Sequence, residues 1–216
     1  MKRHEQQETK KALLIVDLQN DFISGGSLAV HEGEDIIPLV NALLKCPFDV
    51  KAASKDWHPE DHGSFAAVQG KKPGEMIQLG GLDQILWPTH CVQGSHGAEF
   101  ATGWDTQKIE KVFYKGIDKN IDSYSTFFDN GHLRSTGLLD YLKGKRVNDL
   151  YFAGLATDYC VKYSVLDAVK QGFKTFVIAD ACRGVNLKPN DTRDSLEEMR
   201  RAGAQIISSQ EVLESV

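Results

Sequence analysis

Short apolar runs alternate with longer stretches of helical periodicity along most of this chain, and this alternation is the strongest constraint on its fold. Runs rich in aliphatic and aromatic residues occupy 11–17, 49–54, 108–114, 149–153, 173–179 and 204–208. Apolar residues recur at helical spacing in 32–46, 136–142, 157–171, 191–202 and a short stretch from 210. Strands that alternate with helices predict a parallel sheet with helices on both faces. The sequence therefore predicts an α/β protein.

A long irregular segment at 55–106 interrupts the alternation. It holds three of the six prolines, all three tryptophans and four of the seven histidines. Loops longer than about 15 residues are usually functional or disordered. No linker or internal repeat divides the rest of the chain. We therefore expect a flexible polar extension at 1–10 and a single domain over 11–216 that contains a functional loop.

Charge and cysteine content indicate the setting in which the protein works. The 216 residues carry a formal net charge of −5 and no basic cluster, whereas nucleic acids and anionic membranes need concentrated Lys and Arg. Neither is expected as a partner. The N-terminus is polar and lacks the apolar region of a signal peptide. Free thiols in a cytoplasmic protein are expected because the four cysteines show no CxxC spacing.

Residues at the carboxyl ends of the predicted strands are candidates for chemistry, because ligands bind at that edge of an open α/β sheet. Asp17 and Lys115 each end a strand, and a buried carboxylate there needs a cation or a proton. Cys160 falls in the first turn of the predicted helix 157–171, with Thr157 as N-cap, where the helix dipole favours a thiolate. The residues alone leave open whether Cys160 is a nucleophile or a structural thiol, and whether Asp17 and Lys115 are solvated strand ends.

The irregular segment contains a candidate metal site. Asp56 and His58 are separated by one residue, so on an extended chain they face the same side, and His90 supplies a third ligand. Two histidines and one carboxylate suit zinc, iron or manganese. His62 follows His58 by four residues, the spacing of one helical face, so it is either a fourth ligand or a donor that orients the others. We expect the orienting role.

Six motifs, taken in order, resemble one family. The stretches 16–22, 56–59, 87–91, 115–116, 121–125 and 154–161 together resemble nicotinamidases of the isochorismatase-like cysteine hydrolase superfamily. The resemblance runs from about Leu13 to the C-terminus. It implies a three-layer α/β/α fold around a six-stranded, mostly parallel sheet.

The resemblance also implies roles for individual positions. The implied catalytic triad is Asp17, Lys115 and Cys160, and the implied metal ligands are Asp56, His58 and His90. A cis peptide bond is implied at Leu155–Ala156, and the backbone N–H groups of Ala156 and Cys160 form the implied oxyanion hole. The residues implied to line the substrate pocket are Phe22, Trp87, Tyr124, Leu155 and Ala156.

The implied activity is metal-dependent hydrolysis of nicotinamide to nicotinate and ammonia through a cysteine thioester, as part of NAD salvage. Zinc is the metal implied, with iron and manganese as alternatives. Pyrazinamide is a related amide that such enzymes can take, and homo-oligomers are frequent in the family. Two other functions stay open: another cysteine hydrolase of the same fold, such as an isochorismatase or a carbamoyl amidohydrolase, and a silent binding domain. The silent domain ranks last, because all three triad positions are present.

Overall fold

The computed structural model describes residues 9–215, and at its centre is a six-stranded sheet with the strand order β5-β2-β1-β6-β7-β8. All pairings in this sheet are parallel. Its strands are β1 (Lys10–Val16), β2 (Val50–Asp56), β5 (Lys111–Lys115), β6 (Val147–Leu155), β7 (Lys174–Arg183) and β8 (Gln205–Ile207). Residues 1–8 of the expected extension lie outside the described part of the chain, whereas Lys10 already belongs to β1.

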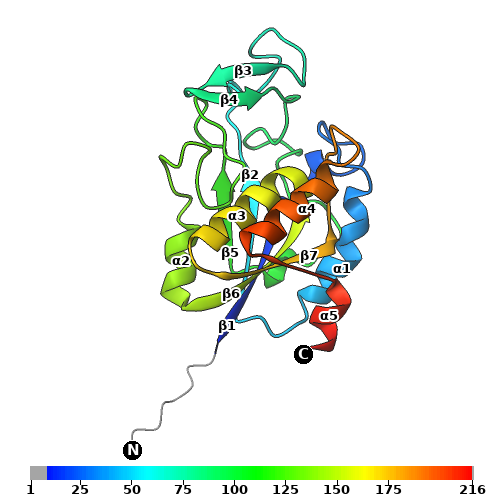
Figure 1. Cartoon of the computed structure of the whole chain (residues 1–216). Coiled ribbons are helices and arrows are strands. Elements are labelled where there is room, and N and C mark those ends of the chain that lie inside the picture. Colours follow the sequence, from blue (N-terminus) through cyan, green and yellow to red (C-terminus); the bar gives the residue numbers. More distant parts are fainter. Residues whose placement is uncertain (1–8, 216) are drawn as a thin grey trace, which may run out of the picture.

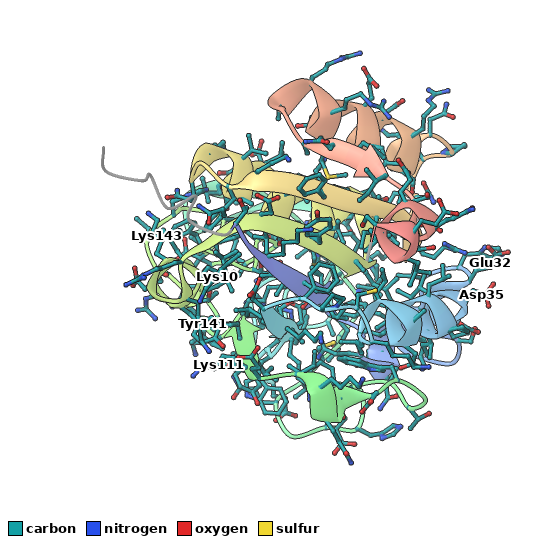
Figure 2. All side chains as sticks on the ribbon, turned by 90° about the horizontal axis from the view of Figure 1, so that it is seen from below. Lys10, Glu32, Asp35, Lys111, Tyr141 and Lys143 are labelled. Carbon is teal, nitrogen blue, oxygen red and sulfur yellow. The ribbon has the colours of Figure 1, made fainter. Side chains whose placement is uncertain are left out.

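Helices cover both faces of the sheet (Figure 1). One face carries α1 (Ile37–Leu43) and α5 (Ser209–Glu214), and the other carries α2 (Leu138–Lys145), α3 (Lys162–Lys170) and α4 (Asp191–Ala202). Viewed along the sheet from below, the charged side chains labelled in Figure 2, such as Lys143 and Glu32, lie at the periphery. The prediction of a three-layer α/β/α fold around a six-stranded sheet is confirmed.

The central strand β1 shows why this sheet is buried on both faces. Successive side chains of a strand point to opposite faces, so Leu14 and Val16 pack with α2, α3 and α4, whereas Leu13 and Ile15 pack with α1 and α5. All four side chains are fully or almost fully buried. A strand with two buried faces must be apolar throughout, which is the pattern that the sequence shows at 12–16, after the exposed Lys10 and Lys11.

The segment 55–106 is less irregular than expected. It contains a hairpin of β3 (Met76–Leu79) and β4 (Leu82–Ile85), and the prediction of irregular structure is wrong there. Gly80 and Gly81, which connect the strands, both have positive φ, as a two-residue hairpin turn of type I′ requires. The hairpin lies beyond the carboxyl ends of the central strands, at the top of Figure 1.

Some helix boundaries also differ from the expected ones. The predicted helix 32–46 is a 3₁₀ turn at Gly33–Ile36 followed by α1, because Pro38 suits the first turn of an α-helix. Further 3₁₀ turns lie at Asn20–Phe22 and Thr106–Lys108. Within residues 9–215, every helix is too short or too polar to cross a membrane.

Candidate active site

Three neighbouring parallel strands bring candidate residues to one edge of the sheet. Asp17 follows β1, Asp56 ends β2 and Lys115 ends β5. In the register of β2 with β5, Asp56 pairs with Lys115. Carboxyl ends of parallel strands meet at the same edge, so the three side chains converge although they are far apart in sequence.

Lys115 joins the groups at this edge. Its side chain is only 1 % exposed, and its Nζ lies 2.9 Å from Asp17 Oδ2 and contacts Asp56 Oδ1. The same ammonium donates to Cys160 Sγ at 3.2 Å and to the Ser123 carbonyl oxygen at 3.1 Å. Burial opposes the charge, but Asp17, Asp56 and Cys160 together raise the pKa of Lys115 well above its usual value, so it is a stable cation. The contact with Asp56 was not foreseen from the sequence.

Asp17 is placed to exchange a proton with the thiol. It is fully buried, its Oδ1 accepts a hydrogen bond from Ser54 Oγ at 2.6 Å, and one of its oxygens lies within 4.8 Å of Cys160 Sγ. Burial raises the pKa of Asp17, and the Lys115 ammonium opposes that rise. A carboxylate with a raised pKa is a stronger base, which suits it to take a proton from a thiol.

Cys160 lies in a π-helical turn, Thr157–Val161, between β6 and α3. Burial raises the pKa of its thiol well above the usual value, and Lys115 offsets only part of the rise. Burial thus opposes the thiolate that the helix end is expected to favour, so the thiol needs a base to take its proton. The prediction of Thr157 as N-cap is wrong, because Ala156 occupies the cap position and the buried Thr157 hydroxyl has no hydrogen-bond partner within residues 9–215. The Leu155–Ala156 peptide bond is cis, as the resemblance implied.

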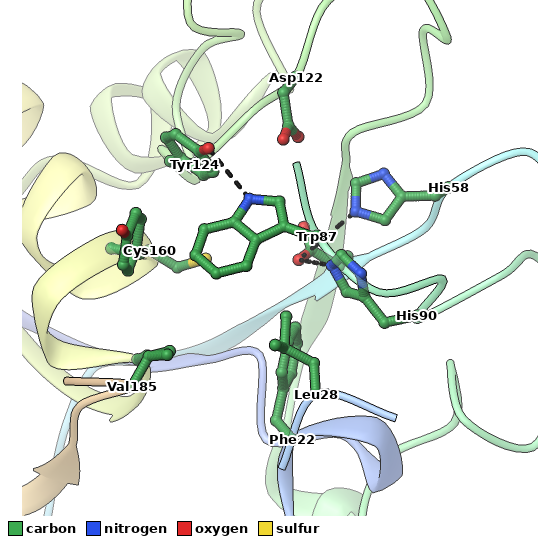
Figure 3. A pocket seen from close by; sticks show the side chains of 12 residues that line it. Phe22, Leu28, His58, Trp87, His90, Asp122, Tyr124, Cys160 and Val185 are labelled. Atoms are coloured by element: carbon green, nitrogen blue, oxygen red, sulfur yellow. Dashed lines mark hydrogen bonds and ion pairs between the residues drawn. The ribbon is translucent and has the colours of Figure 1, made fainter. Parts of the chain in front are cut away.

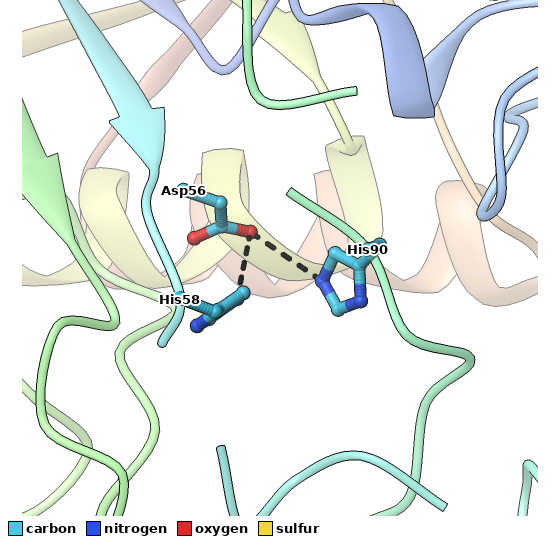
Figure 4. A group of neighbouring side chains, drawn as sticks. All are labelled: Asp56, His58 and His90. Atoms are coloured by element: carbon cyan, nitrogen blue, oxygen red, sulfur yellow. Dashed lines mark ion pairs between the residues drawn. The ribbon is translucent and has the colours of Figure 1, made fainter. Parts of the chain in front are cut away.

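The three predicted metal ligands converge on one point (Figure 4). Asp56 Oδ2 lies 3.7 Å from His58 Nε2 and 3.8 Å from His90 Nε2. The Nδ1 atoms of the two histidines face carbonyl oxygens, of Gly116 at 2.9 Å and of Pro88 at 2.7 Å. A carbonyl only accepts hydrogen bonds, so Nδ1 carries the proton and the Nε2 lone pair faces the carboxylate. These residues fit a metal ion by their donor types and by their orientation.

His62 lies beside this set and is held by different partners. Its Nδ1 lies 2.7 Å from Ser64 Oγ, and its ring centroid is 4.4 Å from that of His58. Burial lowers the pKa of His62 to about 4, so the ring is neutral near pH 7. The carbonyls of Gly116 and Pro88, and not His62, orient the two histidine ligands. Its Nε2 is buried and has no hydrogen-bond partner in the described part of the chain.

A pocket opens between the thiol and the metal ligands (Figure 3). It holds about 370 Å³ of space free of atoms, part of it open to solvent. The indole of Trp87 donates to the Tyr124 hydroxyl at 3.1 Å on one wall. The lining residues are Phe22, Leu28, Asp56, His58, Trp87, His90, Asp122, Tyr124, Ala156, Tyr159, Cys160 and Val185.

Four of the five predicted pocket residues line this pocket, and Leu155 does not. Its side chain is buried in the apolar cluster between the sheet and α1. The lining residues absent from the prediction are Leu28, Asp122, Tyr159 and Val185. Tyr159 and Val185 follow the carboxyl ends of β6 and β7, so the position of the strand ends was a usable signal. Asp122 lies within the motif 121–125 but was not singled out there, and for Leu28 the sequence offers no signal.

The fold and the site define a cysteine hydrolase of α/β architecture, and comparison with known proteins gives its family. The isochorismatase domain model matches residues 11–211, so the chain belongs to the isochorismatase family. The resemblance to the nicotinamidases of this family is confirmed.

Several relatives of known function or solved structure are similar to this chain over most of its length. The chain is 49 % identical over 197 residues to the Escherichia coli nicotinamidase, covering 90 % of this chain and 92 % of that protein. A solved nicotinamidase and pyrazinamidase from Acinetobacter baumannii superposes with a TM-score of 0.91 at 43 % identity, over 96 % of this chain and all of that one. A Pyrococcus horikoshii pyrazinamidase solved in complex with zinc has a TM-score of 0.75 at 35 % identity, over 92 % and 99 % of the two chains.

Proposed function

We propose that this protein hydrolyses nicotinamide to nicotinate and ammonia. One observation carries the proposal: Lys115 Nζ lies 3.2 Å from Cys160 Sγ and 2.9 Å from Asp17 Oδ2, next to a three-residue metal set in the same aromatic pocket. The nicotinamidases among its relatives support the choice of substrate. Pyrazinamide, which also carries a carboxamide on a flat aromatic ring, is the second substrate that we propose.

The chemistry begins with proton transfer from the Cys160 thiol to Asp17. The resulting thiolate, held beside the Lys115 ammonium, attacks the carboxamide carbon and forms a C–S bond. We assign the backbone N–H groups of Ala156 and Cys160 to the oxygen of the tetrahedral intermediate, where each donor contributes about 3 kcal/mol in comparable acyl-transfer sites. Asp17 returns the proton to the nitrogen as the C–N bond breaks and ammonia leaves. Water then cleaves the thioester, with Asp17 as base, which releases nicotinate and restores the thiol.

Asp56, His58 and His90 are the residues that would hold a divalent metal ion, and we propose zinc. Bound there, the ion supplies a Lewis acid for a lone pair of the substrate, such as that of the ring nitrogen. The zinc complex of the Pyrococcus horikoshii pyrazinamidase supports this choice. Iron and manganese accept the same donor set. All four cysteines are free, which supports our placement of the enzyme in a reducing cytoplasm, in NAD salvage.

The decisive experiment measures ammonia release from nicotinamide, pyrazinamide and a carbamoyl amide by the purified protein, together with its metal content. We expect hydrolysis of nicotinamide, an equivalent of bound metal, and loss of activity in Cys160→Ala. Full activity without metal would instead favour another cysteine hydrolase of the same fold. A metal-loaded protein that releases no ammonia from nicotinamide would refute the proposed substrate.

A further inference from the structure

Gln84 is a buried residue of β4, in the hairpin next to the pocket. The strand β4 alternates, so Asp83 is exposed whereas Gln84 turns inward and is only 2 % exposed. A buried polar side chain needs hydrogen-bond partners, and those of Gln84 identify what it does.

The amide nitrogen of Gln84 connects two residues of the pocket wall. Its Nε2 lies 3.0 Å from Asp122 Oδ2, 2.9 Å from the Tyr124 hydroxyl and 2.7 Å from the carbonyl oxygen of Ile85. An ionised carboxylate and a carbonyl only accept hydrogen bonds, so the nitrogen and not the oxygen of the amide belongs at this position.

The Tyr124 hydroxyl is held from two sides. It accepts a hydrogen bond from Gln84 Nε2 and another, at 3.1 Å, from Trp87 Nε1. A phenolic oxygen has two acceptor positions, and the two N–H groups occupy both. This arrangement fixes the Tyr124 hydroxyl at the N–H edge of the Trp87 indole on the wall of the pocket (Figure 3).

Gln84 itself does not line the pocket, whereas Trp87, Tyr124 and Asp122 do. Asp122 is fixed from its other side by the Ser123 backbone N–H, which donates to Oδ1 at 2.7 Å. A substitution that removes the Gln84 amide would therefore change no residue of the pocket lining. Tyr124 and Asp122 would each lose one of the hydrogen bonds that hold their side chains.

We propose that Gln84 is a positioning residue that sets the affinity of the pocket for its aromatic substrate. It does so by holding the Tyr124 hydroxyl in hydrogen-bond contact with the Trp87 N–H. It acts through Tyr124 and does not contact the substrate. The inference rests on the proposed hydrolysis of nicotinamide.

The test compares Gln84→Leu with Gln78→Leu in the metal-loaded enzyme. Gln78 is a matched control because it lies on β3 of the same hairpin and bonds Asp83 on the exposed side. In Gln84→Leu we expect KM for nicotinamide and the Kd for nicotinate, measured by calorimetry, to rise about tenfold, since about one net hydrogen bond is lost. The value of kcat should stay within about twofold, because the binding wall changes and the triad does not. Gln78→Leu should match the wild type.

A second pair of variants separates positioning from general stability. In a Tyr124→Phe background the acceptor is absent, so adding Gln84→Leu should change KM less than about twofold. Gln84→Glu keeps the shape but not the donor and should raise KM as Gln84→Leu does, which keeps the test open if the leucine variant fails to fold. An active wild type with unchanged KM in both Gln84 variants, or a fully additive double mutant, would overturn this inference alone. A wild type inactive on nicotinamide would overturn the proposed function and this inference with it.

Discussion

Lys115 and Asp56 are paired in the register of β5 with β2, and their side chains meet through Nζ and Oδ1. The same ammonium lies 2.9 Å from Asp17 Oδ2, so one cation serves the proposed base and a proposed metal ligand. The thiol chemistry and the metal set are therefore electrostatically one site.

Replacing Lys115 tests this connection. Lys115→Met leaves the buried Asp17 and Asp56 without their shared cation, and breaking such a buried pair costs about 3–5 kcal/mol in the free energy of unfolding. We expect ammonia release to fall by a factor on the order of 10³ or more. Metal binding should persist, because Asp56 keeps its charge. Urea unfolding and metal analysis check these effects, with the exposed Lys111→Met on the same strand as control. Retention of full activity would exclude the proposed triad.

Alkylation of the metal-free protein measures the state of the Cys160 thiol. Burial raises the pKa of Cys160 well above 9.0, so the thiolate fraction, and with it the rate of reaction with iodoacetamide, should still increase between pH 8 and about 9. Cys182, a second thiol whose pKa burial raises to about 12, is followed in the same samples. Mass spectrometry of timed samples reports both rates. A rate for Cys160 that is already level below pH 8 would show a lowered thiol pKa instead.

Metal removal should distinguish the residues that bind the metal from the proposed catalytic base, Asp17. A chelator should abolish ammonia release, and zinc should restore it. Metal present at about 100 times its Kd stabilises the folded state by ~2.7 kcal/mol, so the melting temperature should drop on chelation. His58→Ala should show neither activity nor metal-dependent stabilisation. Asp17→Asn should lose activity but keep the metal effect, because Asp17 lies outside the ligand set. Equal loss of metal from both variants would contradict this division.

The sequence was sufficient to predict the parallel sheet and the residues at its carboxyl edge. From Ala12 to Val16, β1 is buried on both faces and apolar in composition, so Asp17 stands out where the strand ends. Lys115 is marked in the same way by the end of β5. Local composition is informative here because burial on both faces leaves a strand few alternatives.

Features that depend on distant partners escaped prediction. The four-residue strands β3 and β4 are too short to show a clear period, although the pair Gly80–Gly81 was a usable turn signal. The proposed role of Gln84 depends on its hydrogen bonds to Asp122 and Tyr124, which lie about 40 residues later in the chain. The thiol pKa was predicted from the local helix end, but it is dominated by burial, which the whole fold determines.

Asp158 offers a last test, because it fixes one wall of the pocket from outside it. Its two carboxylate oxygens accept hydrogen bonds from the backbone N–H groups of Val185, at 2.9 Å, and Asn186, at 2.7 Å, and Val185 lines the pocket. Asp158→Asn replaces one acceptor by a donor that faces an N–H group, so we expect a loss of about 1–3 kcal/mol in the free energy of unfolding.

The displacement of Val185 should also raise KM for nicotinamide in Asp158→Asn more than it lowers kcat, since the triad is untouched. Urea unfolding and steady-state kinetics measure the two effects. The exposed Asp194→Asn on α4 is the matched control and should leave both unchanged. An Asp158→Asn variant as stable as the wild type, with the same KM, would show that the 184–186 loop holds its position without this carboxylate.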